Sequence, residues 1–276
     1  CFEIEAASVQ APLHGYLARP IGAKPGTLPG IVLTHGAGVN SSRLGTALKW
    51  AKDGFLALDF NVHGLPNGQP AEYYAGLRHG ALRAYNTSGR ESRETVYFRH
   101  VFLRLLRAID SVAAQPEWDG KHLVVCGRSQ GGAQAIVAGG LDGRVTYVSA
   151  EVPALCDHTG ILAGRVNGWP RFIPNGTVKP DPRVVEAVRY YDVVNFARRV
   201  RAEAFLTVGF IDTVCPPTGI YAAFNQIPGK KRIWDHIDTG HVGRADYEAR
   251  MREEILAYLA ASRSRGRPSG PWAISP

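Results

Sequence analysis

A serine between glycines is the strongest chemical signal in this chain. Ser129 lies in the pentapeptide Gly127-Arg128-Ser129-Gln130-Gly131, which follows an apolar segment of strand type and precedes small residues of helix type. A strand that turns sharply into a helix at Gly-x-Ser-x-Gly strains the serine backbone and exposes its hydroxyl. The first N–H of the helix, that of Gln130, then faces a developing oxyanion. The motif predicts a nucleophile, with a chance pentapeptide in a glycine-rich chain as the alternative.

An acid and a base follow the serine in the order that a catalytic triad needs. A serine hydroxyl requires a base within hydrogen-bond reach and an acidic group behind that base. Asp212 directly follows one apolar strand-like segment, and His241 follows the last one. Since the order serine, acid, histidine belongs to this serine motif, we predict a triad of Ser129, Asp212 and His241. His158 precedes the acid and His236 lies inside a strand pattern, so both fit less well.

A glycine-containing loop is placed to supply a second oxyanion donor. The tetrapeptide His-Gly-Ala-Gly at 35–38 directly follows the strand-like segment 31–34. Glycines there let the backbone approach a substrate oxygen closely. We predict that the N–H groups of Ala37 and Gln130 form the oxyanion hole, and an ordinary glycine turn is the alternative. The sequence has no GxGxxG, phosphate loop or metal-ligand cluster, so we expect neither a cofactor nor a metal.

Segments of strand type alternate with segments of helical periodicity through most of the chain. This alternation predicts a largely parallel sheet with right-handed crossovers and helices on both faces. Sites in such sheets lie at the carboxyl ends of the strands, where all three triad candidates are expected. One or two strands are expected within 2–19, with Pro12 and Gly15 marking a turn between them. The other expected strands are 31–34, 55–60, 145–152, 204–210 and 231–237; the expected helices are 43–53, 94–114, 182–199, 217–226 and 244–262; a strand–turn–helix unit spans 122–140.

Length and composition indicate one α/β domain over residues 1–276. The chain has 276 residues, of which 45% are hydrophobic, and this suffices for a sizeable core. No apolar run approaches the length of a membrane span, so no membrane partner is expected. The net charge of +8 is spread along the chain and not gathered on one helix. It is therefore interpreted as a contribution to solubility and not as a nucleic acid interface.

Two irregular segments, 61–93 and 157–181, are expected to be loop insertions near the active site, because connections this long are usually functional. Residues 264–276 are expected to form an extended tail. The insertions carry aromatic side chains that we expect to wall a small pocket and to stack on sugar rings. Packing within the loops is the alternative for them. These side chains are Tyr73, Tyr74, Trp169 and Phe172.

The four cysteines show no C-x-x-C pattern and no histidine at metal spacing. Cys126 falls within an expected buried strand and is interpreted as a core residue. Cys156 and Cys215 follow strands, and unpaired thiols are expected although a contact between the two is open. The chain starts at Cys1 without an initiator methionine. We therefore expect a trimmed or processed product, cytoplasmic or exported, and any targeting segment would lie outside this sequence.

The glutamine after the serine and four further segments point to one group of hydrolases. The run Gly-Arg-Ser-Gln-Gly-Gly at 127–132 is similar to Gly-x-Ser-Gln-Gly-Gly, whereas other hydrolases more often have Met, Tyr or Leu after the serine. On these residues the chain resembles the acetyl xylan esterase and cephalosporin-C deacetylase family, over most of 28–245. The resemblance implies an α/β-hydrolase fold with loop insertions over the carboxyl ends of the strands. The other similar segments are 94–110, 152–157, 211–218 and 221–225.

The chain departs from this family at three motifs. The family's Arg-Gly-Gln is replaced by Asn-Val-His-Gly at 61–64, and its His-Glu by His241-Val242. Its oxyanion tyrosine is replaced by Ala37. Many members of the family form hexamers that restrict access to small acetylated molecules. The resemblance thus makes a homo-oligomer possible and implies small substrates.

We predict a serine carboxylesterase that removes short acyl groups, acetate in particular, from acetylated sugars, xylooligosaccharides or similar small esters. The partner is then a small-molecule ester. Feruloyl and glucuronoyl esterases are alternatives within the fold. A dienelactone hydrolase would usually carry Cys at position 129, and a peptidase would bring a large extra domain. A non-catalytic binding protein of the same fold is a further alternative, against which the complete triad argues.

Overall fold

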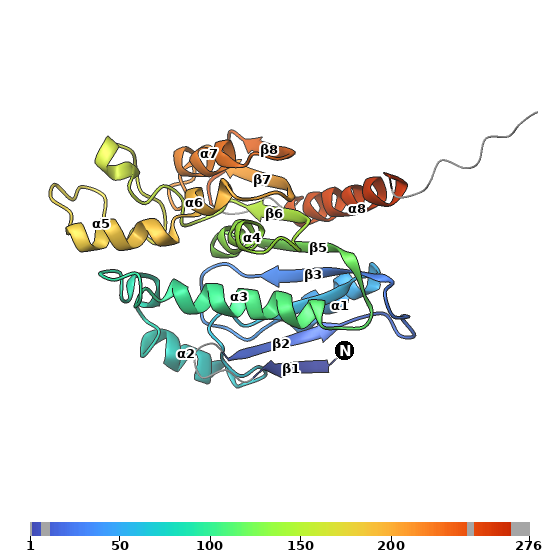
Figure 1. Cartoon of the computed structure of the whole chain (residues 1–276). Helices are drawn as coiled ribbons and strands as arrows, with labels where there is room; N and C mark the ends of the chain where they lie inside the picture. The colour runs from blue at the N-terminus through green and yellow to red at the C-terminus, as the bar shows by residue number, and fades with distance from the viewer. Residues whose placement is uncertain (1, 7–11, 242–245, 266–276) are drawn as a thin grey trace, which may run out of the picture. The chain divides into compact units, whose positions relative to one another are not determined.

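The computed structural model describes residues 2–6, 12–241 and 246–265 (Figure 1). The chain forms one compact unit over 1–243, which holds the sheet, and a second unit over 244–276, which holds one helix, α8 (Tyr247–Arg265). In α8 an ion pair between Arg250 and Glu254 joins successive turns at 2.6 Å. Among the described residues, no helix combines the length and apolar character needed to cross a bilayer.

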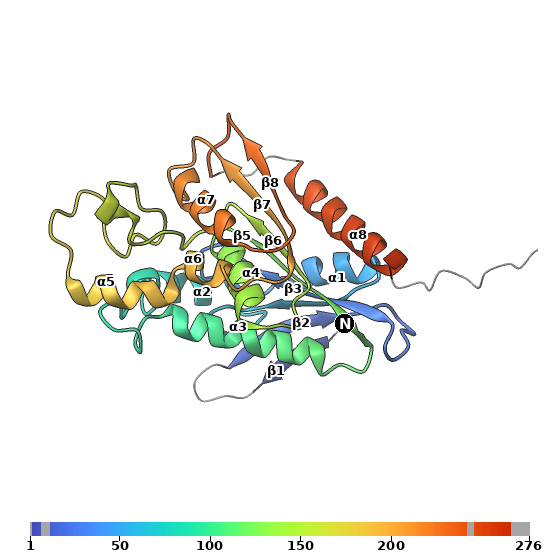
Figure 2. The same cartoon turned by 45° about the horizontal axis from the view of Figure 1, so that its top comes forward.

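The first unit is built on an eight-stranded sheet with the order β1-β2-β4-β3-β5-β6-β7-β8. The six strands from β4 to β8 in this order are parallel, and β1 and β2 pair antiparallel at one edge. This confirms the predicted, mostly parallel sheet, whose strands fan out with the usual twist (Figure 2). The strands are β1 (Phe2–Ala6), β2 (Leu13–Ala18), β3 (Leu28–Thr34), β4 (Leu56–Phe60), β5 (Trp118–Arg128), β6 (Tyr147–Glu151), β7 (Glu203–Gly209) and β8 (Lys231–His236).

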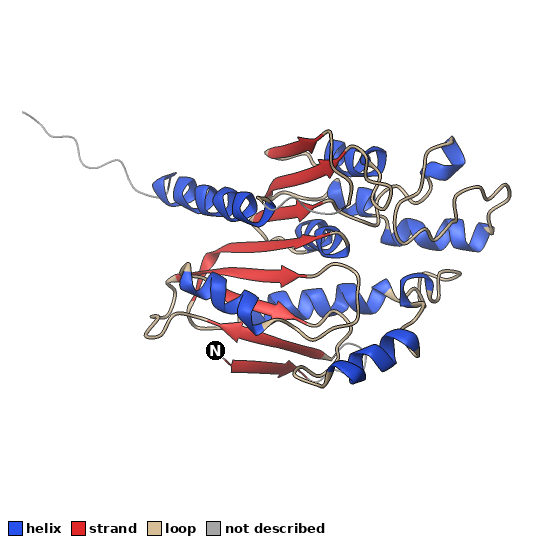
Figure 3. Cartoon of the chain, turned by 180° about the vertical axis from the view of Figure 1, so that it is seen from behind, coloured by secondary structure: helices blue, strands red, loops and turns tan. Residues whose placement is uncertain are grey.

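Strand β3 lies at the centre because its residues are apolar on both faces. All seven of its residues are buried, and Ile31 pairs with Ala57 on one side and Val124 on the other. Continuous apolar runs of this kind are typical of parallel strands covered by helices on both faces. Two of these covering helices, α3 and α4, lie on one face, and α1 lies on the other (Figures 1 and 3).

The helices connect successive strands, as the alternating pattern predicts. Helix α4 is buried around most of its circumference, because it packs on β5 and β6 beneath α6. Gly139 and Gly140 permit this approach, since a Cβ at Gly140 would lie 2.5 Å from a carbonyl oxygen of α6. The helices of this unit are α1 (Leu44–Lys52), α2 (Ala71–His79), α3 (Phe98–Ala113), α4 (Gln130–Leu141), α5 (Pro182–Val188), α6 (Val193–Ala197) and α7 (Pro217–Gln226), with short 3-10 turns at Tyr85–Thr87, Gly160–Ala163 and Arg189–Tyr191.

The structure differs from the sequence-based expectations in three places. The segment 61–93, expected to be irregular, contains α2, and Tyr74 is its one buried residue, so no apolar stripe marks the helix. The single helix expected over 182–199 is two helices, because the Asp192 carboxylate accepts the Val194 N–H and starts a new one. Gly15, expected in a turn, lies within β2, where a side chain would meet the Asp59 carbonyl oxygen.

The two insertions lie on the side of the sheet where the parallel strands end (Figures 1 and 3). One carries α2, and the other leads into α5. The expected tail from residue 264 begins inside α8, and its remaining residues 266–276 lie outside the described part of the chain. The sheet therefore offers its carboxyl edge, bordered by these insertions, to the candidate catalytic residues.

Candidate active site

Ser129 occupies the sharp turn between β5 and α4. Its backbone has φ 56° and ψ −117°, a conformation that costs a non-glycine residue free energy and that recurs at functional sites. Its N–H donates to the carbonyl oxygen of Glu151 at 2.7 Å, which ties the turn to the end of β6. At Gly127 a Cβ would lie 2.1 Å from the Thr34 hydroxyl, and at Gly131 it would lie 2.7 Å from the Thr34 carbonyl oxygen. Both glycines are therefore needed for the turn to pass the end of β3.

Ser129, His241 and Asp212 form one hydrogen-bonded chain. His241 Nε2 lies 3.0 Å from Ser129 Oγ, and His241 Nδ1 lies 2.8 Å from Asp212 Oδ2. Because an ionised carboxylate only accepts hydrogen bonds, Nδ1 carries the proton and Nε2 is free to accept the serine proton. The Asp212 side chain is fully buried, whereas that of His241 is 23% exposed. The arrangement is that of a nucleophile, a general base and an orienting acid.

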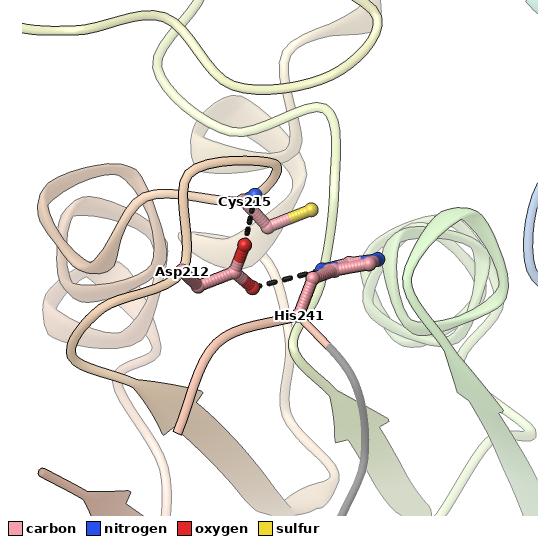
Figure 4. A group of neighbouring side chains, drawn as sticks. All are labelled: Asp212, Cys215 and His241. Carbon is pink, nitrogen blue, oxygen red and sulfur yellow. Dashed lines mark hydrogen bonds and ion pairs between the residues drawn. The ribbon is translucent and has the colours of Figure 1, made fainter. Parts of the chain in front are cut away.

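The Asp212 carboxylate is held by the loop that follows β7 (Figure 4). Its Oδ1 accepts the N–H groups of Val214 and Cys215, each at 2.8 Å, which leaves Oδ2 for His241. The loop that follows β8 and carries His241 lies next to it, and the Ile211 N–H donates to the Thr239 carbonyl oxygen of that loop at 3.2 Å. Two loops that follow different strands thus meet at the acid–histidine pair.

Arg128 was not predicted to have a role, although it stands next to the serine. Its guanidinium donates a hydrogen bond to the carbonyl oxygen of His241, and its Nε lies 2.9 Å from a carboxylate oxygen of Glu151. Burial raises the pKa of Glu151 to about 7, while the charge of Arg128 acts in the opposite direction. Arg128 therefore links the serine turn to the backbone of the general base. The variable position of the motif carried no sequence signal for this contact.

Cys215 adds a thiol beside the acid and the base. One donor atom each from Asp212, Cys215 and His241 lies within 4.8 Å of the others, which is a spacing at which three ligands can hold a metal (Figure 4). However, Asp212 and His241 are hydrogen-bonded to each other, and burial raises the pKa of the Cys215 thiol well above its usual range. We therefore interpret the group as part of the triad. Cys126, Cys156 and Cys215 are free thiols.

The loop at 35–38 passes beside the nucleophile. A Cβ on Gly36 would lie 3.8 Å from the Ser129 Cβ, and Ala37 lines the same cavity as the serine. The Gln130 N–H is the first of α4, so it has no acceptor within the helix. The Gln130 side chain is buried, and its Oε1 accepts the Tyr85 hydroxyl at 2.8 Å. Ala37 thus shares a cavity with Ser129, and Gln130 follows the serine directly at the start of α4.

A cavity of about 490 Å³ opens in front of the serine. Trp169 lines it, whereas Tyr73, Tyr74 and Phe172 do not. Tyr73 is partly exposed on α2, the Tyr74 hydroxyl donates to the Pro66 carbonyl oxygen, and Phe172 packs in the core. Tyr74 and Phe172 therefore follow the alternative of packing within the loops, whereas Tyr73 is exposed outside the cavity. The lining residues are Thr34, His35, Gly36, Ala37, Gly38, Asn40, Ser41, Arg43, Phe60, Asn61, Val62, His63, Arg128, Ser129, Trp169, Val214 and His241.

A sequence model of the acetyl xylan esterase family (AXE1) matches residues 1–260. The acetyl esterase Axe7A of Xylanibacter ruminicola is 38% identical over 222 residues, and the chain spans about half the length of this curated relative (79% of this chain, 50% of the relative). Among solved structures, an acetyl xylan esterase from Paenibacillus sp. R4 superposes with a TM-score of 0.75 at 29% identity, covering 90% of this chain and 80% of that one. Acetyl xylan esterase 1 from Thermoanaerobacterium sp. gives a TM-score of 0.76 at 25% identity, covering 93% and 83%.

Proposed function

This chain belongs to the acetyl xylan esterase family, and on that premise we propose that it is a serine carboxylesterase that removes acetyl groups from acetylated sugars, xylooligosaccharides or similar small esters. The observation that carries the proposal is the position of His241, hydrogen-bonded to both Ser129 and Asp212. An ester hydrolase needs this chain of proton transfer, and a binding protein does not.

The geometry supports the following reaction. His241 Nε2 takes the proton of Ser129 as its oxygen attacks the ester carbonyl, and Asp212 stabilises the imidazolium. The N–H groups of Ala37 and Gln130 hold the negative oxygen of the tetrahedral intermediate. His241 then protonates the leaving alcohol, and the serine carries the acyl group. Water attacks the acyl-enzyme with His241 again as the base, and the acid is released.

The cavity suits a small ester. Its volume of about 490 Å³ falls within the usual range of small-molecule sites. Trp169 offers an aromatic face on which a sugar ring can stack. A long acyl chain would need an extended apolar channel, whereas polar side chains such as Asn61 and His63 interrupt the apolar part of this lining. These features support a short acyl group, and a homo-oligomer remains a prediction to be measured by light scattering.

Acetate release tests the proposal. The purified chain is incubated with 4-nitrophenyl acetate, acetylated xylooligosaccharides and cephalosporin C, with Ser129→Ala as the blank. The variant is expected to lose at least about three orders of magnitude in kcat. Unchanged activity in Ser129→Ala would show that another group is the nucleophile.

Two further assays separate the alternatives. Faster cleavage of 4-nitrophenyl octanoate than of the acetate would contradict the short acyl group, and a preference for feruloyl or glucuronoyl esters would reassign the substrate. A fluorophosphonate probe is expected to label Ser129. A folded protein that takes up no label and releases no acetate would indicate a binding function.

A further inference from the structure

His63 stands where the family's Arg-Gly-Gln motif is replaced, and its two ring nitrogens are both engaged. Nε2 lies 2.9 Å from the Gly38 carbonyl oxygen, and Nδ1 lies 2.8 Å from the Tyr97 hydroxyl. A carbonyl oxygen only accepts hydrogen bonds, so Nε2 carries the ring proton and Nδ1 accepts the Tyr97 hydroxyl. The partners of the ring thereby select one tautomer, in which His63 donates to the loop beside Ser129.

Burial keeps this ring neutral. His63 is 5% exposed. Its pKa is lowered from 6.5 to about 4, first by burial and then by the charge of Arg104, while the Gly38 carbonyl acts in the opposite direction. The bond from Nε2 to Gly38 is therefore present in the same form throughout the neutral pH range.

Tyr85 connects the same glycine to the other oxyanion donor. Its ring packs edge-on against His63 with the ring centroids 4.7 Å apart. Its hydroxyl donates to Gln130 Oε1 at 2.8 Å. The Gly38 backbone lowers the Tyr85 pKa and so opposes the rise that burial causes. Gly38 is thus bonded to His63, whose ring packs against Tyr85. Through Tyr85 it is linked to the helix start that carries the Gln130 N–H.

These contacts matter because the loop would otherwise be free to change shape. It contains glycines at 36 and 38, and Gly38 has φ +149°, so its backbone gains little order from its own residues. Oxyanion donors stabilise a transition state only when they are already in place before the charge develops. An anchor on Gly38, the residue directly after Ala37, limits the directions that the Ala37 N–H can take.

We propose that His63 is a positioning residue for the oxyanion hole, which with Tyr85 holds the Ala37–Gly38 segment at a fixed distance from the Gln130 N–H. This inference rests on the proposed esterase activity. The Asn-Val-His-Gly segment at 61–64 would then support the oxyanion hole through His63, although His63 does not contact the reacting atoms. It also gives a reason for the burial of a histidine at the wall of the active-site cavity.

The test compares His63→Ala with His63→Gln in the full chain. A glutamine amide reaches the place of Nε2 and can donate to the Gly38 carbonyl oxygen, whereas alanine cannot. We expect His63→Ala to lower kcat for 4-nitrophenyl acetate about 10- to 100-fold, less than the loss of a whole oxyanion donor, with KM changed less than about threefold. His63→Gln is expected to recover most of that loss. The matched control is His79→Gln, at an exposed histidine on α2.

A second readout separates positioning from general damage. Methylboronic acid forms a tetrahedral adduct with a catalytic serine, so its inhibition constant should rise in His63→Ala by about the same factor as kcat falls. If His63→Ala does not fold, Tyr85→Phe is the second variant. It removes one hydroxyl and is expected to lower kcat about 5- to 20-fold. Its control is Tyr190→Phe, which removes the hydroxyl of an exposed tyrosine.

The outcomes are distinct. An unchanged kcat in a folded His63→Ala, a loss found entirely in KM, or boronate inhibition that stays constant while kcat falls would each overturn the role of His63. A folded wild type that releases no acetate from any of the esters would overturn the proposed esterase function instead.

Discussion

Replacing His63 by glutamine should change how the stability of the fold depends on pH. The pKa of His63 is about 4 in the folded chain, below the ordinary value of 6.5 that it regains on unfolding. Above pH 6.5 the ring is neutral in both states, so the pKa difference costs nothing. As pH falls below 6.5, the unfolded chain binds a proton that the folded chain refuses, and stability is lost until pH reaches about 4.

The magnitude follows from the two pKa values. A tenfold change in an equilibrium constant is worth about 1.4 kcal/mol. Protonation of His63 therefore stabilises the unfolded chain relative to the folded chain by about 2 kcal/mol at pH 5 and by about 3 kcal/mol at pH 4. Glutamine does not titrate. The free energy of unfolding of the wild type should therefore fall relative to His63→Gln by these amounts between pH 7.5 and pH 4.

The assay is urea unfolding of both proteins at pH 7.5, 5 and 4. Glu151 acts with the opposite sign, because its pKa is raised to about 7 in the folded chain and its contribution is lost as pH rises through that value. Glu151 is present in both proteins, so it cancels in their difference. His79→Gln controls for the loss of one histidine. A difference between wild type and His63→Gln that stays constant over this pH range would refute the buried, neutral imidazole.

Three further changes test the active-site geometry. Asp212→Asn should lower kcat for 4-nitrophenyl acetate about 10⁴-fold with little change in stability. The reason is that the amide turns its N–H₂ toward His241 Nδ1 and favours the wrong tautomer of the histidine. A loss in kcat below tenfold would contradict this. Gly127→Ala should destabilise the fold by about 1–3 kcal/mol, because its Cβ would lie 2.1 Å from the Thr34 hydroxyl at the end of β3. The control is Gly143→Ala, whose Cβ meets nothing within 4 Å. Equal thermal unfolding temperatures for the two variants would count against the clash. Ser129→Gly should be more stable than Ser129→Ala by about 1 kcal/mol, because glycine tolerates the φ of 56° at position 129. A glycine variant that is less stable than the alanine variant in urea unfolding would show that the turn is not strained.

The sheet and most of its helices were predictable because their signals are local. Apolar runs such as 31–34 follow from contacts on both faces of a parallel strand, and their periodicity is visible without the partners. Helix α2 was missed because one buried residue makes no stripe. The break at Asp192 was missed because a carboxylate that caps a helix looks the same in sequence as one on a helix surface.

The sequence by itself determined the candidates for the reaction. The pentapeptide at 127–131 requires a turn that few residues allow, and the order of Ser129, Asp212 and His241 follows from the order of the strands that carry them. The family resemblance rests on the same local motifs, and the match over residues 1–260 agrees with it. These conclusions needed only neighbours in the chain.

The tertiary structure decided which side chains surround the reaction. Trp169 lines the cavity, whereas Tyr73, Tyr74 and Phe172 do not, because the fold of each insertion sets which way its aromatic residues face. The link from Arg128 to the His241 backbone depends, in the same way, on loops that only the sheet brings together. So does the anchor from His63 to Gly38. Hydrogen bonds of this kind form between residues that are distant in sequence, so no periodicity or spacing announces them.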